Sequence, residues 1–313
     1  QLPVTAYFDE SLYRQELHRL FDNGPGYCGH RLMVPEPGDY RTLVAEQEGR
    51  VLVNQRPAAQ NPQGRIELLS NVCRHRQAIM LNGSGNADSI VCPLHRWTYD
   101  LDGSLKGAPH FDQQPCLELP RYPLLQEGQG RLFESPRDIA ADLRGMSVAA
   151  DLDFSGYRLD HVEVHECNYN WKTFIEVYLE DYHVVPFHPG LGHFVDCNDL
   201  KWEFGEWYSV QTVGLHRDLQ KPGSPVYRKW HDEVLRFNGG KLPKYGAIWL
   251  TYYPNLMVEW YPNSLIISSL IPRGPGKTTN IVEFYYPEEI VWFEREFIEA
   301  ERAAYMETAI EDD

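Results

Sequence analysis

The chain has 313 residues, 13% of them aromatic, which is enough for two domains with cores of ordinary size. Its formal net charge of −16 argues against nucleic acid or an anionic membrane surface as a partner. No apolar run approaches the roughly 20 residues that a membrane-spanning helix needs. The first residues lack the basic and apolar regions of a signal peptide, so we expect a cytoplasmic protein. Because residue 1 is not Met, we expect the natural chain to begin earlier.

The first half of the chain is predicted to be mainly β. Residues 8–21 have the apolar spacing of a short amphipathic helix. Short β-prone runs then alternate with Gly, Pro, Asn and Asp, which predicts a small antiparallel domain. The clearest of these runs are 50–55, 66–72, 90–92 and 97–101. Residues 136–156 are predicted to form a connector, with a short helix at 138–144.

Helices and strands are mixed in the second half. Residues 170–183 fit a helix, and 246–271 fit strands broken at 254–255 and 262–263. Pro287 is predicted to begin a long helix that runs to the end of the chain, with acidic residues in its first turn. Its apolar face is predicted from Ile290, Phe293, Phe297 and Ala304. Together the two halves predict an α+β protein.

Two turns each carry one cysteine and one histidine. They are Cys73-x-His75 and Cys92-x-x-His95, with sixteen residues between them. Two thiolates and two imidazoles are the donors of a [2Fe–2S] cluster in which histidines replace cysteines on one iron. This pattern matches the Rieske signature, although Arg96 stands where many relatives have glycine. The other cysteines have no partner at ligand spacing and are interpreted as incidental thiols: Cys28, Cys116, Cys167 and Cys197.

A zinc site is the alternative interpretation of the same four donors. Structural zinc sites, however, usually pair cysteine with cysteine and histidine with histidine along the chain, whereas each of these turns holds one of each. The cluster is therefore the favoured interpretation. A cluster domain alone could belong to an electron-transfer protein, so the rest of the chain decides the function.

A second group of possible metal ligands lies in the segment 170–190. His183 and His188 follow Glu180 by three and eight residues, and on a helix Glu180 and His183 would be neighbours. Two histidines and one carboxylate form the facial triad that holds Fe(II) with open positions for O2. Asp181 lies only two residues before His183, so on a helix the two side chains would not be neighbours, and we interpret Asp181 as a charge on the helix surface. A ligand-binding module without catalysis is the alternative that this histidine pair disfavours.

Motif for motif, the chain resembles the α subunits of Rieske ring-hydroxylating oxygenases. The resemblance covers the N-terminal helix, the turn at 35–40, both cluster loops, the segment from Asn170 to Gly190 and the acidic C-terminal helix. It implies a Rieske domain at 31–145 and a helix-grip catalytic domain at 146–313 with a central antiparallel sheet. Residues 1–30 would be a helical segment that packs with the catalytic domain.

The resemblance also assigns the site residues. It implies that His183 and His188 bind the mononuclear iron, with an Asp of the last helix as third ligand. We choose Asp312, with Asp313 as the alternative. Glu180 matches the family's bridging acid, which would link His183 to His95 of the partner subunit. Most members have Asp there, and a Glu is similar to the branch that oxidises carnitine and other quaternary ammonium compounds.

The same resemblance implies the partners. We expect electrons from NAD(P)H through a separate reductase of the flavin or ferredoxin type, and a head-to-tail homotrimer in which adjacent subunits share electrons. The substrate would be a small molecule that is hydroxylated or oxidatively demethylated with O2. We favour N-methyl or quaternary ammonium compounds over the alternative, an aromatic carboxylate, because an aromatic box can attract such cations. The candidate residues are Trp202, Trp207, Tyr208, Tyr252, Tyr253, Trp260 and Tyr261.

Overall fold

The computed structural model describes residues 2–57, 64–113, 115–127, 129–135, 137–217, 219 and 221–312. It divides into two compact units, one of residues 25–137 and one that joins 1–24 to 138–313. The sequence placed these boundaries at 30/31 and 145/146. The first boundary falls earlier because Tyr27–His30 forms a strand that pairs with Arg131–Phe133 of the smaller unit. Among the described residues no helix is long and apolar enough to cross a membrane.

The described residues of the smaller unit form three antiparallel sheets. Their strand orders are β5-β2-β3-β4-β9, β6-β7-β8 and β1-β11-β10. The predicted β runs are confirmed, because β3, β4, β6 and β7 lie within them. The strands are β1 (Tyr27–His30), β2 (Asp39–Thr42), β3 (Arg50–Asn54), β4 (Ile66–Ser70), β5 (Ser84–Asn86), β6 (Ile90–Val91), β7 (Thr98–Tyr99), β8 (Leu105–Gly107), β9 (Arg121–Tyr122), β10 (Leu125–Gln126) and β11 (Arg131–Phe133).

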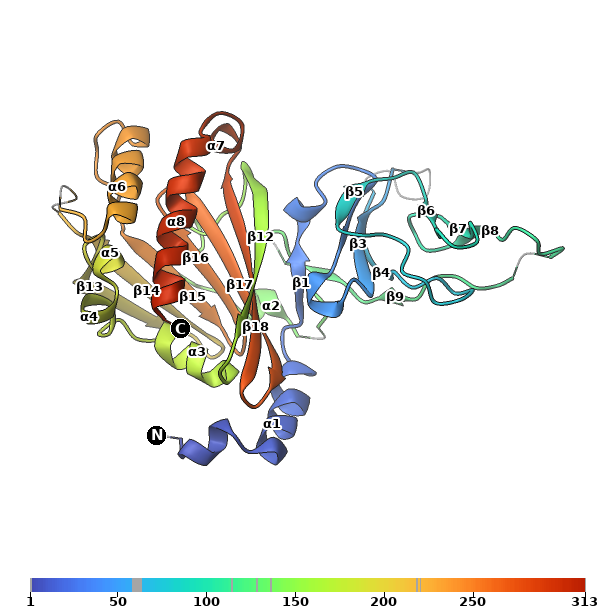
Figure 1. Ribbon diagram of the computed structural model, residues 1–313, viewed down its shortest axis with the longest axis horizontal. Helices are drawn as coiled ribbons and strands as arrows, with labels where there is room; N and C mark the ends of the chain where they lie inside the picture. The colour runs from blue at the N-terminus through green and yellow to red at the C-terminus, as the bar shows by residue number, and fades with distance from the viewer. Residues whose placement is uncertain are drawn as a thin grey trace. The chain divides into compact units, whose positions relative to one another are not determined.

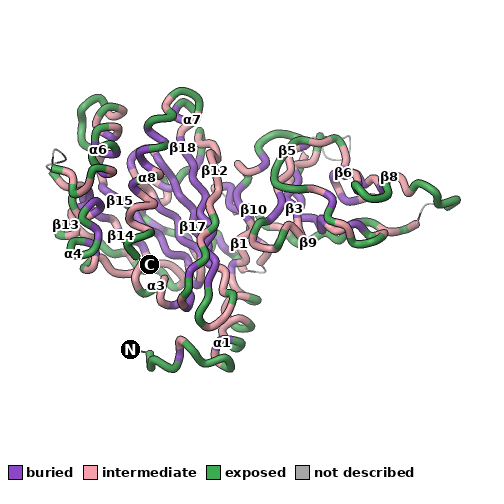
Figure 2. Tube along the Cα trace, viewed as in Figure 1, coloured by how far each residue is buried: buried purple, intermediate pink, exposed green. Residues whose placement is uncertain are grey.

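The larger unit is built on one seven-stranded antiparallel sheet, in the order β12-β18-β17-β16-β15-β14-β13 (Figure 1). Its middle strands are buried along most of their length, while exposed residues gather on the outer helices and turns (Figure 2). The strands are β12 (Tyr157–Cys167), β13 (Val195–Phe204), β14 (Tyr208–Leu215), β15 (Ala247–Tyr252), β16 (Leu256–Tyr261), β17 (Ser264–Gly274) and β18 (Lys277–Pro287). The α+β prediction is confirmed.

The two longest helices of the larger unit, α6 and α8, lie against one face of this sheet. In Figure 1, α6 and α8 run side by side across that face, and Trp230 of α6 packs edge-on against Phe297 of α8 at 5.1 Å between ring centroids. The helices are α1 (Glu10–Glu16), α2 (Ile139–Asp142), α3 (Trp171–Tyr178), α4 (Val184–Phe187), α5 (Pro189–Gly192), α6 (Pro225–Phe237), α7 (Glu288–Phe293) and α8 (Arg295–Glu311). Helical turns at Val4–Tyr7 and Leu17–Phe21 flank α1.

The prediction of one continuous C-terminal helix is wrong at one point. Glu294 takes φ −127° and ψ 56°, which interrupts the helix and separates α7 from α8. Phe293 is consequently 83% exposed, although its spacing predicted an inward position. Ile290, Phe297 and Ala304 are buried as predicted. After the break, α8 runs without further interruption to the acidic end of the chain, so its register decides which acids face the interior.

The start of α3 is fastened to the N-terminal segment. Asn170 caps the helix by accepting a hydrogen bond from the amide of Lys172 at 3.0 Å, and its side-chain amide donates to the carbonyl of Tyr7 at 3.1 Å. The Lys172 ammonium and the Trp171 indole both reach the carboxylate of Glu16, at 2.8 Å and 3.1 Å. These contacts hold α3, and with it the segment that follows, against the rest of the larger unit.

Candidate metal centres

Backbone hydrogen bonds shape the two loops that carry the predicted cluster donors. The amide of Cys73 donates to the carbonyl of Ala78 at 2.9 Å, and that of Cys92 to the carbonyl of Trp97 at 2.8 Å. Each loop therefore turns back on itself around its cysteine. Arg96 has φ 62°, a left-handed conformation that favours glycine because an L side chain is strained there. Arg96 therefore occupies a position whose backbone conformation favours the glycine that many relatives have there.

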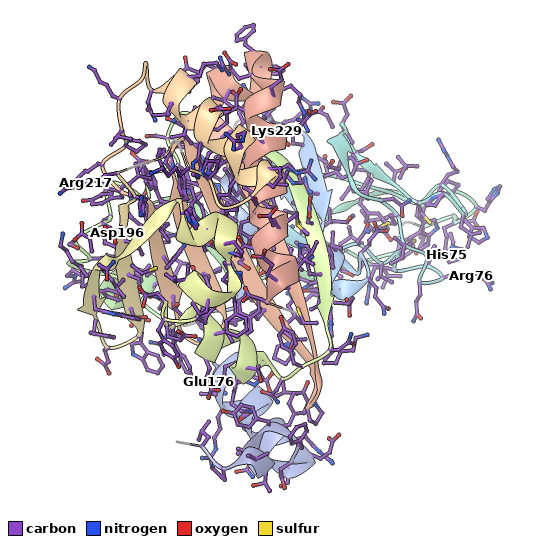
Figure 3. All side chains as sticks on the ribbon, turned by 60° about the vertical axis from the view of Figure 1, so that its left-hand side comes forward. His75, Arg76, Glu176, Asp196, Arg217 and Lys229 are labelled. Carbon is purple, nitrogen blue, oxygen red and sulfur yellow. The ribbon has the colours of Figure 1, made fainter. Side chains whose placement is uncertain are left out.

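The donor side chains of these loops suit a metal cluster. Cys73 and Cys92 are 1% exposed and form no disulfide, and the rings of His75 and His95 lie 4.7 Å apart. Nδ1 of His75 is buried without a hydrogen-bond partner, an arrangement that costs free energy unless a ligand satisfies the nitrogen. Trp97 stacks on the His75 ring at 4.9 Å and covers one of its faces. Figure 3 shows His75 and Arg76 among the loops at one end of the smaller unit.

The four donors are not arranged around a single ion. In the described part of the chain, His183, His188 and Asp312 form the one group of three or more such residues whose ligand atoms all lie within 4.8 Å of one another. A tetrahedral zinc site would bring its four ligand atoms equally close, since each lies about 2.0 to 2.3 Å from the ion. A cluster of two irons holds its cysteine pair and its histidine pair on different metals. The geometry therefore fits the cluster better than zinc.

The predicted mononuclear ligands converge within the larger unit. Nε2 of His188 lies 3.0 Å from Oδ1 of Asp312, and Nε2 of His183 lies 3.8 Å from the same oxygen. The two imidazole rings are 5.1 Å apart and nearly perpendicular. His188 is 1% exposed, so a metal held here would be shielded on that side from water. The alternative ligand, Asp313, lies outside the described residues.

A carboxylate orients each imidazole from behind. Nδ1 of His183 hydrogen-bonds Oε1 of Glu180, and Nδ1 of His188 hydrogen-bonds Oε2 of Glu311 at 2.9 Å. In both rings Nε2 remains for the metal, which is the usual arrangement around metal-bound histidine. Sequence reasoning named Glu180 but missed Glu311. The signal in the sequence was its place directly before Asp312.

The segment around Glu180 differs from the predicted helix. α3 ends at Tyr178, and Glu180 reaches His183 across a turn, with the amide of His183 donating to Oε2 of Glu180 at 3.2 Å. The prediction that 170–183 is one helix is therefore wrong. Asp181 is not a helix-surface charge either, because its Oδ2 is buried. Glu176, one turn earlier, contacts the Tyr7 hydroxyl of the N-terminal segment (Figure 3).

A cavity of about 190 Å³ opens beside the three converging ligands. Among the aromatic residues proposed from the sequence to form a cation box, only Tyr261 lines it. Tyr252 shows why the others do not: it is fully buried and its hydroxyl donates to Asp142 at 2.5 Å, away from the cavity. The aromatic lining comes from other positions: Tyr169, Phe174, Tyr178, Phe194, Tyr227, Trp230, Trp249 and Tyr305.

Two buried acids share this cavity. Glu259 of β16 and Glu301 of α8 are 4% and 3% exposed, and both line the cavity. Burial raises the pKa of Glu259 to about 8 and that of Glu301 to about 7. The Tyr261 hydroxyl opposes the first shift and the Tyr286 hydroxyl the second. Sequence reasoning missed both acids. An acidic residue within the apolar run of β16 could have identified Glu259, because a buried carboxylate often has a functional role.

Comparison with known families covers both units. Residues 26–123 match the Rieske [2Fe-2S] domain, and residues 154–313 match the ring hydroxylating alpha subunit, catalytic domain. The chain is 73% identical over 313 residues to putrescine 2-hydroxylase of Ralstonia nicotianae, covering all of this chain and 84% of that protein. It is 58% identical over 328 residues to putrescine 2-hydroxylase of Bordetella bronchiseptica, covering all of this chain and 74% of that protein.

A solved structure shares the fold. The quaternary ammonium Rieske monooxygenase CntA, in complex with an inhibitor, superposes with a TM-score of 0.74 at 21% identity, over 99% of this chain and 82% of that one. The match extends across both units of the present chain. At this level of identity the likeness bears on the fold alone.

The raised pKa of Glu301 predicts a pH-dependent stability. Because its folded pKa of about 7 exceeds the ordinary value of 4.5, its contribution is full below pH 4.5 and is lost as pH rises through 7. Glu301→Gln removes this loss, so above pH 8 the ligand-free variant should be more stable than the wild type by about 3 kcal/mol. Near pH 5 the two should be similar. Urea unfolding at both pH values measures the difference.

Glu299→Gln is the matched control, since Glu299 lies on the same helix with a side chain 65% exposed. This variant should follow the wild type at both pH values. An advantage of Glu301→Gln that is equal at pH 5 and pH 8.5 would contradict the assignment of the effect to ionisation of Glu301.

Proposed function

The chain belongs to the Rieske non-haem iron oxygenases as an α subunit, and we propose that it hydroxylates an aliphatic diamine with putrescine, 1,4-diaminobutane, as the best supported substrate. In this family the cluster supplies electrons and the mononuclear iron activates O2. One oxygen atom would enter a C–H bond and the other would leave as water, with two electrons supplied through a separate reductase and two protons taken from solvent.

The observation that carries the proposal is the pair of buried carboxyl groups in the cavity. Glu259 and Glu301 face it, and no lysine or arginine is among the described residues that line it. A cationic substrate would favour their ionised forms and pair with them, whereas an aromatic carboxylate would meet two buried acids and no lysine or arginine. The names of the two relatives at 73% and 58% identity support the same class of substrate.

Primary and quaternary amines place different demands on this cavity. A quaternary ammonium group has no N–H and is held mainly by aromatic faces. A primary ammonium has three donors, and it gains most from carboxylates and hydroxyls. Tyr178, Tyr261 and Tyr305 offer hydroxyls beside Glu259, so the lining favours the primary amine.

The first prediction concerns the substrate. With reductase and NADH, the protein should convert 1,4-diaminobutane to a hydroxylated diamine, with NADH consumed in step with product and no formaldehyde released. Choline, carnitine, benzoate and phthalate should consume little NADH and give no product. Mass spectrometry and a formaldehyde assay distinguish the outcomes. If formaldehyde were released from a quaternary amine faster than the hydroxylated diamine is formed, the reaction would be oxidative demethylation and our proposal would be wrong.

The second prediction concerns the metal ligands, which we propose to be His183, His188 and Asp312 for the mononuclear iron. The wild type should contain about three iron atoms per chain and no zinc. Asp312→Ala should contain about two and keep the visible spectrum of the cluster. Asp313→Ala is the matched control and should keep three. If Asp313→Ala lost iron while Asp312→Ala retained it, the third ligand would be Asp313 and not Asp312.

The third prediction concerns Glu180, which we propose to bridge His183 to His95 of the partner subunit in a head-to-tail trimer. Such a contact needs exposed groups near Glu180 and near His95. Tyr182 and Phe187, which follow Glu180 in the chain, are 81% and 67% exposed. On the smaller unit Leu94, directly before His95, is 57% exposed. Apolar groups exposed beside both metal sites suit a contact between copies of the chain.

Glu180→Ala should keep all its iron but lose at least about tenfold in steady-state turnover, because the orienting carboxylate and the link between subunits are both removed. Glu176→Ala is the matched control, since Glu176 lies in the same segment but contacts Tyr7. It should retain normal turnover. Full steady-state activity of Glu180→Ala would disprove the bridge, and a monomer in sedimentation analysis would disprove the trimer.

A further inference from the structure

Building on the proposed function, we propose that Glu259 and Glu301 form a subsite that binds an ammonium group of the substrate. Glu259 accepts a hydrogen bond from this ammonium group directly. The contact positions the substrate and so determines which carbon is hydroxylated. Both carboxylates line the cavity that contains His183, His188 and Asp312. No lysine or arginine is among the described residues that line the cavity, although the Arg302 charge lowers the pKa of Glu301. A cationic group in the cavity would supply an ion-pair partner for both acids.

The carboxylate of Glu259 is held in a fixed orientation. The Trp249 indole donates to the Tyr261 hydroxyl at 3.0 Å, and that hydroxyl donates to Oε2 of Glu259 at 3.0 Å. Trp249 and Glu259 are also directly paired across β15 and β16. A chain of hydrogen bonds that starts on the neighbouring strand therefore fixes the acid. Such preorganisation is what an acceptor for one ammonium group requires.

Tyr178 supplies an independent sign of a missing ligand. Its hydroxyl is buried and has no hydrogen-bond partner, although the side chain lines the same cavity. Leaving a buried hydroxyl unsatisfied costs free energy. An ammonium group on Glu259 could donate to this oxygen as well, because it has three N–H donors. The carboxylate and the hydroxyl thus define the chemistry of a primary amine.

Two observations favour Glu259 as the acceptor on the side of the metal ligands. The negative charge of Asp312 raises the pKa of Glu259. Along α8, Glu301 precedes Asp312 by eleven residues, about 16 Å of helix axis. In the proposed subsite Glu259 is therefore the acceptor for the short chain of a four-carbon diamine. Glu301 adds a second negative charge behind it.

Ionisation of the acids is coupled to the ligand in this arrangement. Burial raises the pKa of both carboxyls in the ligand-free cavity, and the Glu301 charge raises that of Glu259 further. An ammonium group placed against them would favour the ionised forms and lower both pKa values. Diamine binding should accordingly release protons at neutral pH. The same binding would offset the cost of keeping two carboxylates buried side by side.

The experiment uses the holoenzyme with its reductase and three substitutions. Glu259→Gln and Glu301→Gln remove the charges while keeping shape. The matched control is Glu283→Gln: Glu283 is 2% exposed on β18, accepts a hydrogen bond from the Tyr285 hydroxyl at 2.6 Å, and does not line the cavity. Iron content and thermal melting confirm that each variant is folded. The probes are 1,4-diaminobutane and its uncharged counterpart 1,4-butanediol.

We expect Glu259→Gln to weaken diamine binding, measured by calorimetry, and to raise its KM, both by about tenfold to a hundredfold. The effect of Glu301→Gln should be severalfold, and Glu283→Gln should match the wild type. Inhibition by the diol, which carries no charge, should be unaffected in all three. A general loss of structure would instead weaken both probes together.

Glu259→Asp tests the positioning role. It keeps the charge but retracts the carboxylate by one methylene, so the diamine should still bind while hydroxylation moves in part to another carbon, as seen by mass spectrometry of the products. Should Glu259→Gln fail to fold, Tyr178→Phe provides the second test, with an expected severalfold loss of diamine affinity at unchanged iron content.

The outcomes separate the two levels of inference. A wild type that hydroxylates the diamine, with Glu259→Gln and Glu301→Gln binding it as tightly as the control, would overturn the subsite and leave the proposed function standing. An unchanged product from Glu259→Asp would overturn the positioning role. A wild type that neither binds nor hydroxylates the diamine would overturn the proposed function and the subsite together.

Discussion

The proposed iron site depends on a carboxylate at the end of α8 meeting two imidazoles more than 120 residues earlier. α8 crosses the sheet and ends where α3 and the turn after it place the histidines (Figure 1). Glu180 and Glu311 hold the rings from behind, so that both Nε2 atoms face the oxygen of Asp312. The Glu180–His183 pair is local, but without the packing of α8 on the sheet Glu311 and Asp312 would not reach the histidines.

That same packing creates the cavity and determines its chemistry. The side chains facing it come from α3, α6, α8 and several strands of the sheet, and they combine aromatic rings with the buried carboxyl groups of Glu259 and Glu301. Burying such acids works against folding at neutral pH, since each must lose its water. Their presence is understandable if the free energy is recovered when a cation binds. Selection for a substrate and selection for stability act here in opposite directions.

The parts of the site that were predictable are local in sequence. Cys73 and His75, or Cys92 and His95, are so close along the chain that almost any turn brings each pair together. Residues 170–183 show the limit of the same reasoning: their apolar spacing suggested one helix, yet α3 ends at Tyr178. The turn after it gives Glu180 the angle at which it can reach the His183 ring. Apolar spacing indicates which face of a helix or strand is buried, but it does not indicate at which residue tertiary contacts terminate that element.

By itself the sequence identified the family and the kind of chemistry and predicted the metal donors, because ligand spacing is a local property of the chain. Only the tertiary structure decided which acids and aromatic residues face the substrate. Glu259 and Glu301 are 42 residues apart and meet through the packing of α8 on the sheet. Most of the aromatic residues singled out from the sequence lie away from the cavity, because which face of a strand borders a cavity depends on what packs against the sheet.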